Sequence, residues 1–101
     1  MNVRELKRIA FIGIGGIGMS ALARFFRQRG VVVSGYDKTE TDLTHALVEE
    51  GIAVHYADDV SLVDKAAELV VYTPAIPQDH AELNWYRTQG YPVFKRSDVL
   101  G

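Results

Sequence analysis

A glycine-rich turn constrains this chain more than any other feature of its sequence. Residues 9–14 form an apolar run rich in β-branched and aromatic side chains, as strands buried on both faces are. The run leads through the pattern Gly13-x-Gly15-x-x-Gly18 into a segment with helical periodicity. This order predicts a strand, a tight turn and a helix whose first amides point at a ligand above the turn. We expect an anion there, because free amides and the helix dipole both favour negative charge.

Each glycine of this pattern has an expected role. Gly13 permits the tight turn out of the strand, and Gly15 lets the backbone approach a ligand with no Cβ in the way. Gly18 lets the new helix pack closely on the strand. Because glycines also mark ordinary turns, a turn that binds nothing is the alternative interpretation.

Length and composition narrow the possible classes of protein. The 101 residues suffice for one compact domain and are too few for two separate cores. The chain has no cysteine, which excludes disulfides and thiolate chemistry and agrees with the reducing cytoplasm, where we expect it to act. A net charge of −2 with scattered basic residues disfavours nucleic acid as a partner. No apolar run approaches the ~20 residues of a membrane span, and the N-terminus lacks the apolar region of a signal peptide, so we expect no membrane partner.

Strand and helix patterns alternate along the rest of the chain. Further strands are predicted at residues 31–36, 52–56, 69–72 and 91–95, and helices at 41–50, within 60–67, at 79–89 and from Ser97 as a cap onward. This alternation predicts an α/β, Rossmann-like three-layer domain. Its five-stranded parallel sheet has the order 3-2-1-4-5, with helices on both faces.

Two further segments fall at the carboxyl edge of the predicted sheet. Asp37 ends the second strand, where dinucleotide-binding folds place an acid that accepts hydrogen bonds from ribose hydroxyls; a turn or capping role is the alternative. Residues 73–77, Thr-Pro-Ala-Ile-Pro, form a stiff extended loop, because each proline restricts the residue before it. In the order 3-2-1-4-5 this loop and the glycine turn border one crevice. The Thr73 hydroxyl then binds a phosphate or sugar oxygen, unless the loop is purely structural.

We predict no metal site and no catalytic residue in this chain. Asp58 and Asp59 are adjacent acids, and we favour a helix cap over a cation site for them. His80 follows Asp79, the expected cap of a helix, and a charged imidazole is unfavourable at a helix N-terminus. This position argues against His80 as a general acid.

Three stretches of the chain together carry a resemblance to a known family. They are Gly-Ile-Gly-Gly-Ile-Gly-Met-Ser-Ala-Leu-Ala at 13–23, Ser-Gly-Tyr-Asp at 34–37 and Val-Val-Tyr-Thr-Pro-Ala-Ile-Pro at 70–77. They resemble the N-terminal, UDP-binding domain of the Mur ligases, and within that family the group that adds L-alanine to UDP-N-acetylmuramate. The resemblance covers essentially residues 1–101 and implies a UDP-sugar-binding, Rossmann-like domain cut from a longer, three-domain ligase.

The resemblance implies roles for the residues of the glycine turn. It assigns the UDP diphosphate to the main-chain amides of six consecutive residues and to the hydroxyl of the last one. These residues are Gly15, Gly16, Ile17, Gly18, Met19 and Ser20.

The resemblance also implies contacts outside the glycine turn. It places the uridine moiety at Asp37, and it places Thr73 and Ala75 beside the phosphate and the amino sugar. The family often has serine where this chain has Tyr36, and often a Gly-His pair near Asp58. We therefore carry over no nucleoside contact to those two positions.

A reaction of the whole enzyme is implied as well. ATP, with Mg²⁺, phosphorylates the carboxylate of UDP-N-acetylmuramate, and the amine of L-alanine attacks the acyl phosphate to begin the peptidoglycan stem peptide. The family's central ATP-binding domain and its C-terminal domain complete that chemistry. This chain lacks a Gly-x-x-x-x-Gly-Lys-Ser/Thr phosphate loop. We therefore expect it to bind the nucleotide sugar, to need no cofactor of its own and to be inactive alone.

Three alternatives remain open from the sequence. A recycling ligase that attaches a tripeptide to the same nucleotide sugar typically has cysteine and threonine where this chain has Gly15 and Ile17. An NAD-binding domain of an oxidoreductase is compatible with the glycine turn and Asp37. A domain that has lost ligand binding and only makes contacts is the third.

Overall fold

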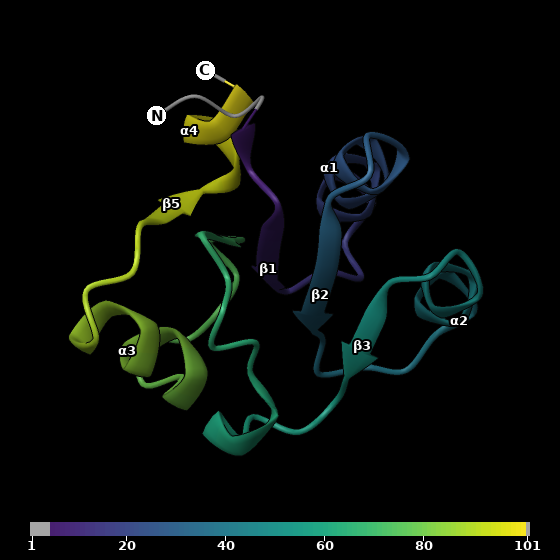
Figure 1. The fold of residues 1–101 in the computed structure, drawn as a ribbon. Helices are drawn as coiled ribbons and strands as arrows, with labels where there is room; N and C mark the ends of the chain where they lie inside the picture. Colours follow the sequence, from purple (N-terminus) through teal and green to yellow (C-terminus); the bar gives the residue numbers. More distant parts are fainter. Residues whose placement is uncertain (1–4, 101) are drawn as a thin grey trace.

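The computed structural model describes residues 5–100, which form the alternating strands and helices of Figure 1. In chain order the elements are β1 (Arg8–Ile12), α1 (Ile17–Gln28), β2 (Val32–Tyr36), α2 (Asp42–Glu49), β3 (Ala53–His55), the 3-10 helix η2 (Val60–Leu62), β4 (Leu69–Tyr72), α3 (Ala81–Thr88), β5 (Val93–Lys95) and α4 (Arg96–Leu100). Residues 1–4 and Gly101, which the sequence analysis assigns to the same domain, lie outside the described residues.

The strands form one parallel sheet in the order β3-β2-β1-β4-β5. The predicted fold class and strand order are therefore confirmed. Ile12 is in register with Tyr36 of β2 and with Tyr72 of β4, so the three central strands end at the same level. Their carboxyl ends form an edge at which the chain leaves the sheet three times.

The sheet separates two apolar layers. Ile9 and Phe11 of β1 pack in one layer with side chains of α1 and α2, and Ala10 and Ile12 pack in the other with Tyr86 of α3. Figure 1 shows the same division, with α1 and α2 on one side of the sheet and α3 on the other. Both faces of the strands are therefore covered, and each large buried side chain contributes about 1.5–3 kcal/mol.

β1 ends at Ile12, two residues before the end of the apolar run, because Gly13 turns the chain at φ +91°. The amides of Gly13 and Ile14 both donate to the Tyr36 carbonyl, at 2.8 and 2.9 Å. Ile14 is fully buried beyond the strand. The turn out of the strand thus lies at Gly13, as predicted, and the apolar pattern continues past it because Ile14 is buried.

Two helices begin differently from the sequence prediction. α3 is capped by His80, whose Nδ1 accepts the Leu83 amide at 3.3 Å, and not by Asp79. α4 follows β5 without an intervening turn, so Ser97 lies inside the helix and is not its cap. At α2 the threonine at position 44 completes a reciprocal capping box with Thr41, a fuller cap than the sequence predicted.

Candidate functional site

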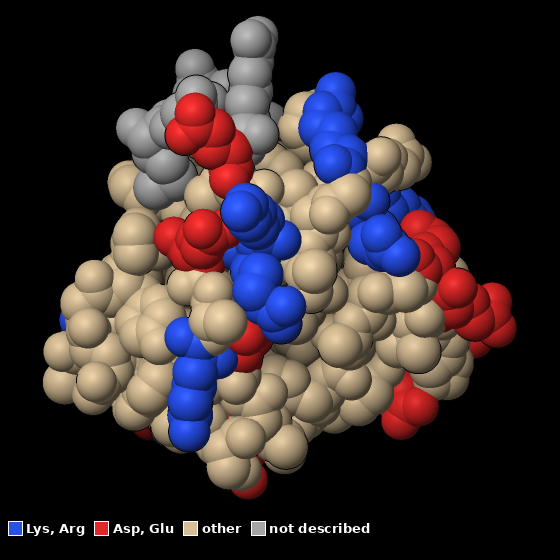
Figure 2. Space-filling model, viewed as in Figure 1, with Lys and Arg blue, Asp and Glu red and all other residues tan. Residues whose placement is uncertain are grey.

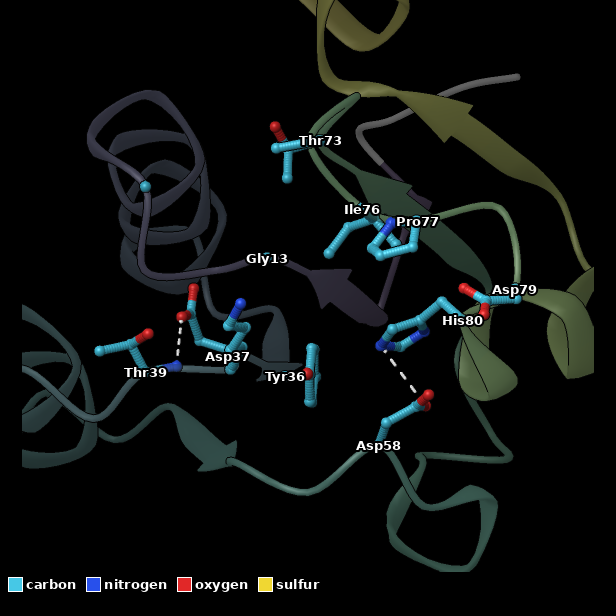
Figure 3. Close-up of a pocket in the computed structure, with 13 residues that line it drawn as sticks. Gly13, Tyr36, Asp37, Thr39, Asp58, Thr73, Ile76, Pro77, Asp79 and His80 are labelled. Atoms are coloured by element: carbon cyan, nitrogen blue, oxygen red, sulfur yellow. Dashed lines mark hydrogen bonds and ion pairs between the residues drawn. The ribbon is translucent and has the colours of Figure 1, made fainter.

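A hollow of about 600 Å³ lies at the carboxyl edge of the central strands. Its wall is built by the glycine turn after β1, by the loop after β2 and by the loop after β4, and His80 and Asp58 close the far side. Figure 3 shows these segments converging on the same space. The prediction that the glycine turn and residues 73–77 border one crevice is confirmed.

A second hollow of about 450 Å³ lies beside the first, at the N-terminus of α1. Residues 16–19 line it together with Thr73 and Pro74 from the loop after β4 and with Arg96 and Ser97 from α4. Gly16 and Thr73 line both hollows, so the two spaces adjoin at these residues. A ligand larger than a nucleoside can extend from one into the other.

The protein itself explains why two positions of the turn are glycine. At Gly13 the positive φ and the Thr73 methyl group both exclude a side chain, as predicted for a tight turn. At Gly15 a Cβ would lie 2.7 Å from Asp37 Oδ2 and 3.0 Å from Thr44 Cγ2. The close approach at Gly15 is therefore made by the protein's own carboxylate.

Gly18, like Gly15, is explained by a side chain of the protein, whereas Gly16 is not. A Cβ at Gly18 would lie 2.7 Å from Nε and 2.8 Å from Cζ of Arg96. The expected packing of Gly18 on the strand is thus wrong: the missing side chain makes room for a guanidinium. Gly16 has an ordinary backbone conformation, φ −68° and ψ 153°, and a Cβ there would meet nothing nearer than 3.9 Å. Nothing in the protein requires glycine at this position.

Some main-chain amides of the turn donate to acceptors in the protein, and others do not. The Gly15 amide donates to Asp37 Oδ2 at 2.7 Å, and the Ser20 amide donates to the Gly16 carbonyl at 2.8 Å. The Ser20 hydroxyl is buried and donates to the Ile17 carbonyl at 3.0 Å. The amides of residues 17–19 lie in the first turn of α1, where no carbonyl of the helix can accept them. No other acceptor for them occurs among residues 5–100. These three amides are the available donors of the turn.

Asp37 stands between the glycine turn and the larger hollow. Its Oδ2 accepts the Gly15 amide. Its Oδ1 accepts the Thr39 amide at 2.9 Å, as Figure 3 shows. Each carboxylate oxygen keeps a further lone pair that can accept a hydroxyl. The turn role that the sequence left open for Asp37 is therefore real, and a ligand contact is compatible with it.

The loop after β4 is tied to the sheet at both ends. The Thr73 amide donates to the Ile12 carbonyl at 3.2 Å, and the Ile76 amide donates to the Thr73 carbonyl at 3.1 Å. Thr73 lines both hollows, and Ala75 lines the larger one. Seven of the nine residues predicted to bind the ligand line these hollows, and their contacts with a ligand stay predictions. Gly15 and Ser20 line neither hollow: the Gly15 amide donates to Asp37 and the Ser20 hydroxyl donates to the Ile17 carbonyl.

Sequence reasoning missed the residues that close the far side of the larger hollow. The rings of Tyr36 and His80 meet edge to face with centroids 4.6 Å apart. Because His80 Nδ1 accepts an amide hydrogen, the proton of the neutral ring is on Nε2, which lies 3.4 Å from Asp58 Oδ1. Asp58 in turn accepts the amides of Ala81 and Glu82, at 2.8 and 2.9 Å. No local sequence signal identifies this arrangement, since its parts come from three separate segments.

The larger hollow is rich in negative charge. Asp37, Asp58 and Asp79 line it, and Lys38 is the cation among its described lining residues. Burial, and then the carboxylates of Asp58, Glu82 and Asp37, raise the pKa of Tyr36 above its ordinary value. The Tyr36 hydroxyl therefore remains a neutral donor at physiological pH.

Of the adjacent acids Asp58 and Asp59, only Asp59 caps the segment that follows, as the sequence predicted; Asp58 accepts amides of the distant α3. Asp59 accepts the Ser61 amide at 2.9 Å and caps η2.

Among residues 5–100 no group of three potential metal-ligating side chains occurs, and none of the helices described there is long and apolar enough to cross a membrane. On the face shown in Figure 2, Lys and Arg side chains lie close to Asp and Glu side chains.

Comparison with known proteins identifies the family. The model of the Mur ligase family, catalytic domain, matches residues 8–101. UDP-N-acetylmuramate--L-alanine ligase of Cytophaga hutchinsonii is 56% identical over 100% of this chain and 23% of that protein. The ligase of the same name from Porphyromonas gingivalis is 52% identical over 95% of the chain and 22% of its own length.

Solved structures agree with the sequence relatives. The crystal structure of UDP-N-acetylmuramate-alanine ligase from Thermotoga maritima matches with a TM-score of 0.88 and 33% identity, over 95% of this chain and 22% of that one. UDP-N-acetylmuramate:L-alanyl-gamma-D-glutamyl-meso-diaminopimelate ligase from Neisseria meningitides matches with a TM-score of 0.84 and 27% identity, over 94% and 30%. This chain thus spans less than a third of the length of these relatives, and it belongs to the Mur ligase family.

Proposed function

We propose that this chain is the UDP-sugar-binding, N-terminal part of a ligase that joins L-alanine to UDP-N-acetylmuramate in the cytoplasm, in the synthesis of peptidoglycan. The support is the printed function of relatives that are 56% and 52% identical over nearly all of the chain. Because the chain spans 23% and 22% of those relatives, we assign ATP, Mg²⁺ and the amide-forming step to the remaining domains of the ligase. The part described here binds and orients the nucleotide sugar.

The charges of the two hollows support one orientation of the ligand. The larger hollow is lined by three aspartates and one lysine, which disfavours a diphosphate and suits a neutral nucleoside whose hydroxyls donate hydrogen bonds. The smaller hollow contains the free amides of residues 17–19 at the positive end of α1. We therefore assign uridine to the larger hollow, with its ribose at Asp37, and the diphosphate to the smaller one. Thr73 and Ala75 then border the phosphates and the amino sugar.

The observation that carries this proposal is the open space at Gly16. The other glycines of the turn are explained by backbone conformation or by a side chain of the protein, whereas Gly16 has an ordinary φ and room for a Cβ. Gly16 is also exposed and lines both hollows. A ligand lying directly on the main chain accounts for the missing side chain at this position.

The substitution Gly16→Ala tests the proposal. Titration of the chain with UDP-N-acetylmuramate, followed by amide NMR, should show affinity falling about 10- to 100-fold, or about 1.4–2.8 kcal/mol, because the methyl group displaces the diphosphate. Thermal unfolding should change little, since the Cβ meets nothing within 3.9 Å. The matched control is Ala66→Ser, which adds one heavy atom in an exposed turn before β4, at the opposite end of the sheet.

Two results would overturn the proposal. One is tighter binding of NAD than of UDP-N-acetylmuramate by the unsubstituted chain, which would favour a domain of an oxidoreductase. The other is equal affinity of the Gly16→Ala and Ala66→Ser variants for UDP-N-acetylmuramate. The NMR titration also reports the site directly: the amide signals of residues 17–19 should shift more than those of residues in η2 or α3.

A further inference from the structure

Arg96 occupies an unusual position at the junction of β5 and α4. β5 pairs with β4, and α4 begins at Arg96 directly after Lys95, so the first residue of the helix is held close to the sheet. Its guanidinium lies against the backbone of Gly18, with Nε, Cζ and Nη2 at 2.7, 2.8 and 3.1 Å from the place where a Cβ would be. A charged side chain from the end of the chain therefore covers the first turn of α1.

Arg96 is partly buried, and its Nε lacks the partner that a buried N–H group normally has. Its Nε is buried and has no hydrogen-bond acceptor among residues 5–100. No ion pair of Arg96 with an aspartate or glutamate occurs in the same part of the chain. An arginine remains charged at any physiological pH, so burying its N–H without an acceptor costs free energy. Such a cost is offset if an anion is bound there.

The surroundings of Arg96 indicate which anion would fit. The hollow that Arg96 lines also contains the amides of residues 17–19. The guanidinium and these amides all donate hydrogen bonds, and both the guanidinium and the helix N-terminus are positive. Thr73 and Ser97 add hydroxyl groups on the same lining. A planar guanidinium binds phosphate oxygens in a bidentate manner, which a lysine cannot do.

We propose that Arg96 is a phosphate-binding residue, which holds the diphosphate of the nucleotide between its guanidinium and the first amides of α1. This inference rests on the proposed function and adds to it a side-chain charge from the opposite end of the chain. It also explains Gly18, because any side chain there would displace the guanidinium. The diphosphate is thereby bound from two sides, by main-chain donors of α1 and by a side chain of α4.

The first test reads Arg96 directly in the unsubstituted chain. The buried Nε–H of Arg96 gives its own NMR signal, and this signal should shift when UDP is added and remain unchanged when uridine is added. A shift of equal size with uridine, or no shift at a UDP concentration that moves the amide signals of residues 17–19, would overturn the proposal. This measurement requires no variant.

The second test compares two arginines that both lie against a glycine. Arg96→Met keeps an unbranched side chain that reaches the position of Nε and removes the charge. Affinity for UDP should fall about 10- to 100-fold, with affinity for uridine unchanged. Arg27→Met is the matched control, because Arg27 also packs on a glycine, Gly51. Arg27 lies in the last turn of α1, at the end of that helix remote from the hollow. Arg96→Lys should fall between the unsubstituted chain and Arg96→Met.

The outcomes separate this inference from the proposed function. If the unsubstituted chain binds UDP-N-acetylmuramate and Arg96→Met binds it equally well, Arg96 has no phosphate role and the proposed function still stands. If affinity for UDP and for uridine fall together, Arg96 is only a structural contact, which also overturns the inference. If the unsubstituted chain binds neither UDP nor UDP-N-acetylmuramate, the proposed function itself is wrong.

Discussion

The two adjoining hollows at the carboxyl edge of the sheet have opposite chemistry. The smaller one presents the amides of residues 17–19 and the guanidinium of Arg96, and the larger one presents the carboxylates of Asp37, Asp58 and Asp79. They meet at Gly16 and Thr73. One side is thus built of donors and the other mainly of acceptors, within a few residues of each other.

This contrast shows how a small domain can orient an asymmetric ligand. A molecule with an anionic end and a hydroxyl-rich end has only one favourable direction across the two hollows. The generic glycine pattern does not determine that direction, because it accounts only for the turn itself. The residues that do so come from the loop after β2, from the loops before η2 and α3, and from α4. The following predictions test whether the acceptor-rich larger hollow is stabilised, and binds its part of the ligand, independently of the donor-rich smaller hollow.

The largest effect is expected for Glu82, whose carboxylate binds the segment next to Asp58 at the larger hollow. Its side chain is fully buried, and its Oε2 accepts the His55 ring at 2.7 Å and the Asp59 amide at 3.0 Å. Glu82→Ala should lower the free energy of unfolding by about 3 kcal/mol, because it empties a fully buried site and leaves two part-buried donors unpaired. Urea denaturation measures this, with the exposed Glu49→Ala as control. A change as small as that of the control would show that the pair contributes nothing.

An intermediate effect is expected for Asp37, which accepts two amides and faces the larger hollow. Asp37→Ala should weaken UDP binding by about 1.5–3 kcal/mol, equivalent to about 10- to 100-fold. Unlike Arg96→Met, it should weaken uridine binding by a similar factor, which distinguishes the two hollows. The exposed Asp42→Ala in the first turn of α2 is the control.

A second ligand sharpens the prediction for Asp37. If its carboxylate accepts a ribose hydroxyl, the unsubstituted chain should prefer UDP to 2′-deoxy-UDP, and Asp37→Ala should lose that preference. Calorimetric titration with both nucleotides measures it. A preference that survives in Asp37→Ala would remove Asp37 from the ribose contact and leave it only its role in the turn.

The smallest effect is a pH dependence that comes from the acidic surroundings of Tyr36. Its pKa is raised above 10.0, chiefly by burial and then by the carboxylates of Asp58, Glu82 and Asp37. A group whose pKa is higher in the folded state contributes stability that is present below pH 10.0 and is lost as the pH rises through the folded value. Asp58→Asn should lower the pKa of Tyr36 without restoring 10.0, because burial remains. Tyrosinate absorbance during an alkaline titration, with Tyr36→Phe as the blank, tests this.

Much of the fold follows from local patterns in the sequence. The run at residues 69–72 coincides with β4, and the alternation of strands and helices was sufficient to predict the order β3-β2-β1-β4-β5. The glycine turn, Asp37 and Thr73 were also predicted to meet, because parallel strands bring their carboxyl ends to one edge. In each of these cases the determining residues are neighbours in sequence or belong to a regular topology.

The errors arise where the determining partner is distant in sequence. The cap of α3 was misassigned because Asp58, 23 and 24 residues away, accepts the amides of Ala81 and Glu82, and His80 caps the next amide. The role of Gly18 was misassigned because Arg96 arrives from the other end of the chain. Neither contact leaves a periodic pattern, so only the folded arrangement reveals them.

The pair of amides that fix the Asp37 carboxylate has a thermodynamic consequence. With both oxygens already oriented by Gly15 and Thr39, this side chain has lost its rotamer freedom before any sugar arrives. A freely rotating aspartate would sacrifice about 0.5–1.5 kcal/mol of conformational entropy at that moment. If a ribose hydroxyl binds there, as we propose, the rigid carboxylate accepts it without the usual ordering penalty, which favours affinity.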